Sequence, residues 1–180
     1  MPDYPSLGFP VLPDAIDKTA RGAIIGLYLA LVHTKVEWTA VLACDLPFVT
    51  GELFEKLISL ATKDFDAVVP MQPDGRAQPL CALYRRESCL PVIEEMLGES
   101  IWKLQELLFR VKTRFVEFED LRDLPCAEHF FFNINTPEDY QRAQHIITDE
   151  GLAGTFVRNV TLSHFGLSLL PLYRHKASAW

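Results

Sequence analysis

The chain has 180 residues, of which 49% are hydrophobic, and this combination indicates one folded domain with a sizeable core. Its 17 Lys and Arg against 24 Asp and Glu residues give a net charge of −7, and no basic block is long enough for a nucleic-acid groove. Any phosphate-bearing partner is therefore expected to be small and to be bound with the help of a metal ion.

The marks of a secreted or membrane protein are also missing from the sequence. The four cysteines show no CxxC spacing, which indicates reduced thiols rather than a disulfide framework or a zinc site. Residues 1–13 carry no basic region followed by a long apolar stretch, and the apolar run 165–172 is far shorter than the roughly 20 residues of a membrane span. We therefore expect a cytoplasmic protein with no membrane or nucleic-acid partner.

Strand and helix patterns alternate along most of the chain. The expected elements, in order, are an extended segment (8–14), a buried helix (22–32), a buried strand (38–44), an amphipathic helix after Thr50, two strands (66–71 and 80–84) joined through a hairpin-like Asp74–Gly75 turn, two helices (90–97 and 101–111), two strands (113–119 and 130–135) and a helix that Thr136 and Pro137 open and that runs to about residue 148.

This alternation predicts an α/β fold, with a mostly parallel sheet covered by helices on both faces. Residues 1–150 are expected to form the domain. Residues 151–180 differ in kind, because they are almost uncharged up to Leu172 and are interrupted by glycines. This atypical apolar tail is expected to be either a loosely docked appendage or sequence foreign to the domain.

Asp45 is the first candidate functional residue. It follows a continuous apolar run, and Pro47 prevents the strand from continuing, so the carboxylate stands at a carboxyl edge of the sheet. Open α/β sheets bind ligands at that edge, and an acid fixed there is suited to hold a divalent cation against phosphates. The alternative is that Asp45 caps the next helix or satisfies a loop.

Asp14 closes the preceding extended segment in the same way, one helix earlier in the chain. A right-handed connection brings two such strand ends to one edge, where paired acids are suited to Mg²⁺ and a nucleotide. The alternative role of Asp14 is to cap the turn before Gly22. The glycines Gly22 and Gly26 allow the backbone to approach either a ligand or a neighbouring strand.

Asn133 and Asn135 flank Ile134 at the end of the strand expected over 130–135. In a strand both amides would face one side, beside a helix N-terminus that attracts anions, and would be placed to bind a substrate ring or a phosphate. The alternative is that they satisfy loop backbone. Gln78, which precedes another strand, is a further candidate ligand contact. No nucleophile–base constellation is evident, which disfavours a covalent mechanism.

Six motifs in collinear order resemble the molybdenum cofactor guanylyltransferase family, which is MobA-like. The match covers about residues 8–146 and consists of VLPD (11–14), RGAIIGLY (21–28), LACDLPF (42–48), AVVP (67–70), QPLCALYR (78–85) and FNINTPED (132–139). The resemblance implies a nucleotide-diphospho-sugar-transferase-like, Rossmann-like fold. It also implies transfer of GMP from GTP to molybdopterin with Mg²⁺, release of pyrophosphate, and other molybdenum cofactor proteins as partners.

The resemblance assigns roles to individual residues. Asp45 is similar to the family's metal- and GTP-binding aspartate, and Asp14 to a second aspartate that contacts the nucleotide. Arg21 and Gly22 are expected on the nucleotide side of the site. The expected pterin side consists of Gln78, Asn133 and Asn135.

The sequence also departs from the family pattern. Family members open with a strand and a glycine-rich loop, LxGGxSxRMGxDK, that holds the nucleotide phosphates, and this sequence shows neither. The resemblance therefore implies an N-terminally incomplete sheet with an unpaired strand edge, and a weak or inactive enzyme. Two alternatives stay open: a non-catalytic remnant or pterin-binding module, and a sister transferase that uses CTP or another acceptor.

Overall fold

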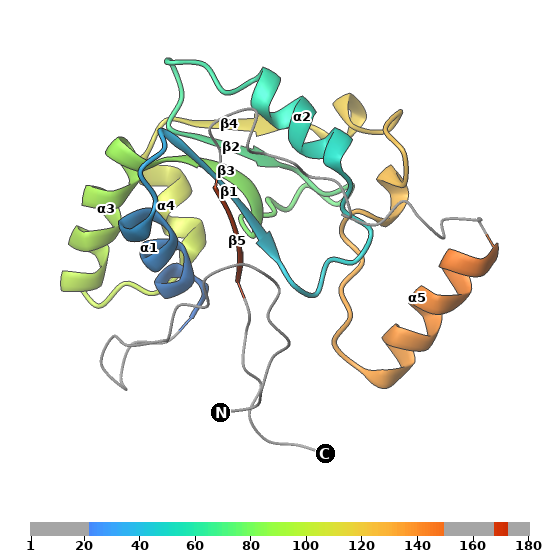
Figure 1. The fold of residues 1–180 in the computed structure, drawn as a ribbon. Helices are drawn as coiled ribbons and strands as arrows, with labels where there is room; N and C mark the ends of the chain where they lie inside the picture. Colours follow the sequence, from blue (N-terminus) through green and yellow to red (C-terminus); the bar gives the residue numbers. More distant parts are fainter. Residues whose placement is uncertain (1–21, 150–167, 173–180) are drawn as a thin grey trace.

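The computed structural model describes residues 22–149 and 168–172, and Figure 1 shows helices packed around a five-stranded sheet. The expected segment 8–14 lies outside the described residues. In chain order the elements are α1 (Ala23–His33), β1 (Trp38–Ala43), α2 (Gly51–Ser59), β2 (Ala67–Pro70), β3 (Cys81–Arg85), α3 (Arg86–Gly98), α4 (Leu104–Arg110), β4 (Thr113–Val116), the 3₁₀ turns η1 (Phe118–Asp120) and η2 (Ala127–His129), α5 (Pro137–Asp149) and β5 (Ser168–Leu172).

The sheet has the strand order β4-β2-β3-β1-β5 and is mixed. Strand β3 runs antiparallel to both of its neighbours, whereas β4 pairs with β2 and β5 pairs with β1 in parallel. Four of the five strands therefore point the same way, which confirms the expected α/β fold. The hairpin-like turn between β2 and β3 is also confirmed, because Gly75 adopts a positive φ of 79° and its N–H donates to the carbonyl of Gln72 at 2.9 Å.

Alternation along the strands creates two cores, one on each face of the sheet. Val41 of β1 faces a first core built with α1, α3 and α4, whereas its neighbour Ala40 faces a second core built with α2 and the segment 121–131. Both residues are fully buried. Because consecutive residues of β1 are buried on opposite faces, the sequence reads as a continuous apolar run, and helices cover both faces as expected.

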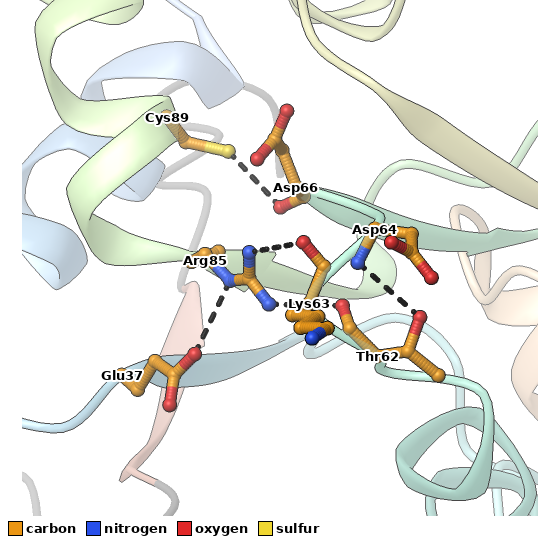
Figure 2. A network of polar contacts seen from close by, with 7 residues as sticks. All are labelled: Glu37, Thr62, Lys63, Asp64, Asp66, Arg85 and Cys89. Atoms are coloured by element: carbon orange, nitrogen blue, oxygen red, sulfur yellow. Dashed lines mark hydrogen bonds and ion pairs between the residues drawn. The ribbon is translucent and has the colours of Figure 1, made fainter.

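A polar network centred on Arg85 fastens the edge of the sheet at which β1 begins and β3 ends (Figure 2). The guanidinium of Arg85 donates hydrogen bonds to the carbonyls of Thr62 and Lys63 at 2.9 and 3.0 Å, and its Nε lies 3.3 Å from Oε1 of Glu37. The guanidinium carbon of Arg85 lies 4.8 Å from the ring centroid of Trp38. A single side chain thus ties the loop after α2 to the start of β1.

The helix expected over 101–111 and the strand expected over 113–119 are shorter than expected, as α4 and β4, and two further elements differ more strongly. The strand expected over 130–135 is wrong: this segment is a turn followed by irregular chain, because the N–H groups of Phe130 and Phe132 donate to the carbonyls of Ala127 and His129. Helix α3 begins at Arg86, four residues earlier than expected, and contains Pro91. The N–H of Arg86 donates to the carbonyl of Glu37 at 2.8 Å, a distant contact that local sequence does not reveal.

Five residues of the tail expected over 151–180 form β5, and the rest of that segment lies outside the described residues. Because β5 pairs with β1 over the five pairs from Thr39–Ser168 to Ala43–Leu172, both sides of β1 are paired, and the unpaired edge implied by the resemblance is not present at this strand. Among residues 22–149 and 168–172, no helix has the length and apolar character needed to cross a membrane.

Candidate functional site

Asp45 lies in the turn that directly follows β1, at the carboxyl edge of the sheet. The strand is held up to its last residue, because the N–H of Ala43 donates to the carbonyl of Leu80 at 2.7 Å, and the turn is closed by a 3.4 Å hydrogen bond from the N–H of Leu46 to the carbonyl of Ala43. Asp45 is half-buried there. The strand end thus gives the carboxylate a fixed origin at the edge where α/β sheets bind ligands.

Gln78 reaches the same edge because β3 is antiparallel. The register pairs Leu42 with Cys81, so the start of β3 and the end of β1 lie side by side. The N–H of Gln78 donates to the carbonyl of Pro70 at 2.9 Å, and its own carbonyl accepts from the N–H of Cys81 at 3.1 Å. The backbone of Gln78 is therefore fixed, and the side chain is half-buried.

Gly22 precedes α1, the helix that leads back along the sheet into β1. It adopts a φ of 107°, which favours glycine, and an added Cβ would lie 3.6 Å from the carbonyl oxygen of Trp102. The conformational need for glycine is thus explained within the fold by the start of α1. Asp14 and Arg21, the other expected nucleotide contacts, lie outside the described residues.

The segment containing Asn133 and Asn135 is fastened directly to Asp45. The N–H of Ile134, which lies between the two asparagines, donates to the carbonyl of Asp45 at 2.9 Å. Both asparagines are exposed. The structure therefore brings the segment 133–135, the NxN segment, to the Asp45 edge, as expected, but through a backbone hydrogen bond and not as the end of a strand.

Aromatic side chains support this junction, and the sequence analysis did not identify them. The ring of Phe48 lies 5.7 Å from that of Phe132 in an edge-to-face arrangement and 5.4 Å from that of His129. The guanidinium of Arg142 lies 5.3 Å from the centroid of Phe132. The run of three phenylalanines before Asn133 is the signal that pointed to a packed junction, although it was interpreted as a strand.

Helix α5 begins with a reciprocal cap that fixes the end of the same segment. The Asp139 carboxylate accepts hydrogen bonds from the N–H groups of Asn135 and Thr136 at 3.1 and 3.0 Å, and its own N–H donates to Oγ1 of Thr136 at 3.1 Å. The hydrogen bond from Asn135, followed by that with Thr136, lowers the pKa of Asp139 below its ordinary value. The expected helix start at Thr136 and Pro137 is confirmed.

The Asp45 carboxylate fits a magnesium ion that is held jointly by the protein and the substrate phosphates. Within the described part of the chain, no three His, Cys, Asp or Glu side chains cluster as a ready-made metal site. Magnesium does not require such a cluster, because proteins usually hold it through one or two carboxylates together with substrate phosphates. A half-buried aspartate at a strand end suits that arrangement.

A mixed sheet with helices on both faces and a carboxylate at the end of its buried strand places the chain among the α/β domains that bind ligands at the carboxyl ends of their strands. Residues 1–113 match the MobA-like NTP transferase domain. The chain belongs to this family.

Curated relatives and solved structures agree with this classification. A Bacillus cereus protein described as a probable molybdenum cofactor guanylyltransferase is 30% identical over 141 residues, which cover 78% of this chain and 68% of that protein. A Bacillus thuringiensis protein of the same description shows the same identity and coverage.

Among solved structures, the molybdopterin-guanine dinucleotide biosynthesis protein A of Archaeoglobus fulgidus is 32% identical, with a TM-score of 0.62. The match covers 71% of this chain and 64% of that one. A protein of Aquifex aeolicus is 29% identical with a TM-score of 0.58, over 72% of this chain and 63% of the other. This chain therefore spans slightly less than two thirds of the length of these two solved proteins.

Proposed function

We propose that the Asp45 edge is the nucleotide site of a molybdenum cofactor guanylyltransferase, which transfers GMP from GTP to molybdopterin. The observation that carries the proposal is the 2.9 Å hydrogen bond from the N–H of Ile134 to the carbonyl of Asp45. It joins the backbone of the candidate metal residue to the segment that carries the candidate pterin-binding asparagines, and a reaction between two substrates requires such proximity. Family membership and the descriptions of the relatives support the same reaction.

In the proposed reaction a phosphate oxygen of molybdopterin forms a bond to the α-phosphorus of GTP. The bond from that phosphorus to the oxygen bridging the α- and β-phosphates breaks, and pyrophosphate leaves with the electron pair. Bound Mg²⁺ supplies charge neutralisation on the phosphates, which matters in a chain with a net charge of −7. No side chain acts as a nucleophile.

Each named residue has a binding or orienting role in this proposal. Asp45 holds the metal and thereby the nucleotide phosphates, with Asp14, Arg21 and Gly22 as further nucleotide contacts. Gln78 and the amides of Asn133 and Asn135 bind and orient the pterin substrate. Cys81 and Cys89 are buried free thiols, which supports the proposal that the reaction takes place in the reducing cytoplasm.

Calorimetry of MgGTP binding to the full chain tests the proposal. Asp45→Asn is expected to weaken binding about tenfold or more, because a charged contact to the metal site is lost. Asp64→Asn is the matched control, because this substitution changes the net charge by the same amount. Asp64 is exposed and lies before β2, at the opposite edge of the sheet. Equal MgGTP affinity of wild type and Asp45→Asn would remove Asp45 from the site.

The same titration separates the proposal from its two alternatives. A sister transferase would bind MgCTP more tightly than MgGTP. A pterin-binding remnant would bind neither nucleotide but would retain affinity for molybdopterin, and that affinity would fall when Asn133 is replaced by Ala.

A further inference from the structure

We propose that the outer edge of β1 is a strand-binding edge, that the chain's own segment 168–172 is its occupant, and that docking of this segment holds the Asp45 turn in place. The first two parts are independent of the proposed function. The third part rests on it, because it concerns the residue proposed to bind the metal. The argument begins with the composition of β1 and the direction of its hydrogen bonds.

Strand β1 is unsuited to stand at the edge of a sheet. Its sequence, WTAVLA, contains no charged residue and no proline, which are residues that natural edge strands use to prevent pairing with other chains. Thr39, Ala40 and Val41 are fully buried. With β3 on one side, removal of the partner on the other side would leave a flat apolar strand open to any chain that can pair with it.

The hydrogen bonds of β1 alternate between its two neighbours. The N–H of Ala43 donates to the carbonyl of Leu80, on the β3 side, so the backbone groups of Val41 and Thr39 point to β3 as well. The backbone groups of Ala40 and Leu42 therefore point to the other side, toward β5. These are the groups that would lose their partners if segment 168–172 were released.

The register of β5 agrees with this alternation at its proline. Pro171 lies opposite Leu42. In a parallel ladder, the residue directly opposite a bonded residue turns its own N–H away, so the donor that Pro171 lacks is not needed for pairing with β1. A shift of the register by one residue would put the proline at a position whose N–H must bond to β1. The sequence of segment 168–172 therefore fits the observed register and disfavours the two registers shifted by one residue.

The last pair of the ladder lies close to the candidate site. Leu172 is opposite Ala43, which is two residues before Asp45. Because β3 holds the other side of Ala43 through Leu80, the end of β1 is clamped from both sides only when β5 is docked. Release of β5 is thus expected to loosen the turn that carries the Asp45 carboxylate.

Two proline variants of the full chain test the proposal. Backbone N–H groups alternate in direction along β5, and the position of Pro171 is one that points away from β1. Leu170→Pro therefore removes an N–H that points to β1, whereas Leu169→Pro removes one that points away. Amide hydrogen exchange by NMR is the readout. The amides of Ala40 and Leu42 are expected to exchange about tenfold faster or more in Leu170→Pro than in wild type, and at the wild-type rate in Leu169→Pro.

The amides of Thr39 and Val41 serve as internal controls, because their partner is β3. They are expected to stay protected in both variants, which shows that the fold persists. Wild-type exchange of Ala40 and Leu42 in Leu170→Pro, together with an unchanged sedimentation coefficient, overturns the strand-binding edge. A larger sedimenting species formed by Leu170→Pro alone supports it, since the opened edge then pairs with a second copy of the chain.

Binding of MgGTP to the same two variants tests the third part separately. Leu170→Pro is expected to bind about tenfold more weakly than Leu169→Pro if β5 holds the Asp45 turn. Equal binding by the two variants, with the Ala40 and Leu42 amides exposed, overturns the positioning role. If wild type itself does not bind MgGTP, the proposed function fails. The exchange experiment still tests whether segment 168–172 occupies the outer edge of β1.

Discussion

The rings of Phe48 and Phe132 meet edge to face with their centroids 5.7 Å apart, and this contact joins two parts of the chain that are far apart in sequence. Phe48 belongs to the loop after β1 and is buried, whereas Phe132 directly precedes Asn133. The pair therefore supports the same junction as the hydrogen bond between Ile134 and Asp45, but with side-chain packing. Its removal should loosen the candidate site before it unfolds the domain.

Replacement of Phe132 by Ala should lower the free energy of unfolding by about 1–3 kcal/mol, since a half-buried ring and its aromatic contacts are lost. The Ile134 amide should exchange faster in the same variant. Urea denaturation and hydrogen exchange measure the two effects. The control is Phe109→Ala, because the Phe109 side chain is 79% exposed and its loss should change stability by less than about 0.5 kcal/mol. Equal effects of the two substitutions would contradict the junction.

The cap made by Asp139 should add a pH dependence to stability. Its pKa is lowered in the folded chain, from an ordinary value of 3.8, by hydrogen bonds that the unfolded chain lacks. The cap therefore stabilises the fold fully above pH ~4, and this contribution is lost as the pH falls through the lowered folded-state pKa. The stability difference between wild type and Asp139→Ala should shrink below pH ~4. A difference that stays constant from pH 6 to pH 3 in urea titrations would exclude this role of the carboxylate.

Arg85→Ala should destabilise the domain by about 2–3 kcal/mol, because two carbonyls lose a charged donor at a side chain that is only 13% exposed. Arg85→Lys should recover part of the loss, since an ammonium group cannot reproduce the planar fork. Chemical denaturation measures both variants. Arg122→Ala is the matched control: its ion pair with Glu119 is exposed and should contribute about 0.5 kcal/mol or less. A loss at Arg122 as large as that at Arg85 would count against the network of Figure 2.

The four thiols should divide into two classes. Burial raises the pKa of the Cys89 thiol to about 12 and also raises that of Cys81, so neither forms a thiolate readily near neutral pH. Cys44 is exposed and Cys126 half-buried. Labelling with a water-soluble thiol reagent at pH 8 should modify Cys44 first, Cys126 next, and Cys81 and Cys89 only upon unfolding. Rapid modification of all four residues in the native chain would contradict the two buried positions.

Local signals explain which elements of the fold could be predicted. The apolar run ended by Pro47 predicted β1 and the position of Asp45, and Thr136 with Pro137 predicted the start of α5. In both cases the information lies within about ten consecutive residues. The arrangement of the NxN segment beside Asp45 was expected as well, because two strand ends were thought to share one edge.

Contacts between distant residues explain the errors. The run Phe130–Phe132 has the composition of a strand, yet its backbone N–H groups are used in consecutive tight turns, and the Phe132 ring packs against Phe48. Helix α3 begins at Arg86 because that residue's N–H meets the carbonyl of Glu37. The pairing of β1 with β5 has no local signature, since strand order depends on contacts across the whole chain. The reversal of β3 does have one, because the Asp74–Gly75 turn indicates a hairpin-like connection.

The hydrogen bond between Ile134 and Asp45 joins two main-chain atoms, and this has a consequence for substitutions at this edge. Substitution of either side chain leaves both the donor and the acceptor in place, and only a proline at position 134 would delete the donor. The side chains at this edge, including the proposed metal carboxylate, can therefore be replaced without losing the anchor that gathers them. The scaffold of the candidate site thus depends on the main chain, whereas its proposed chemistry depends on the side chains.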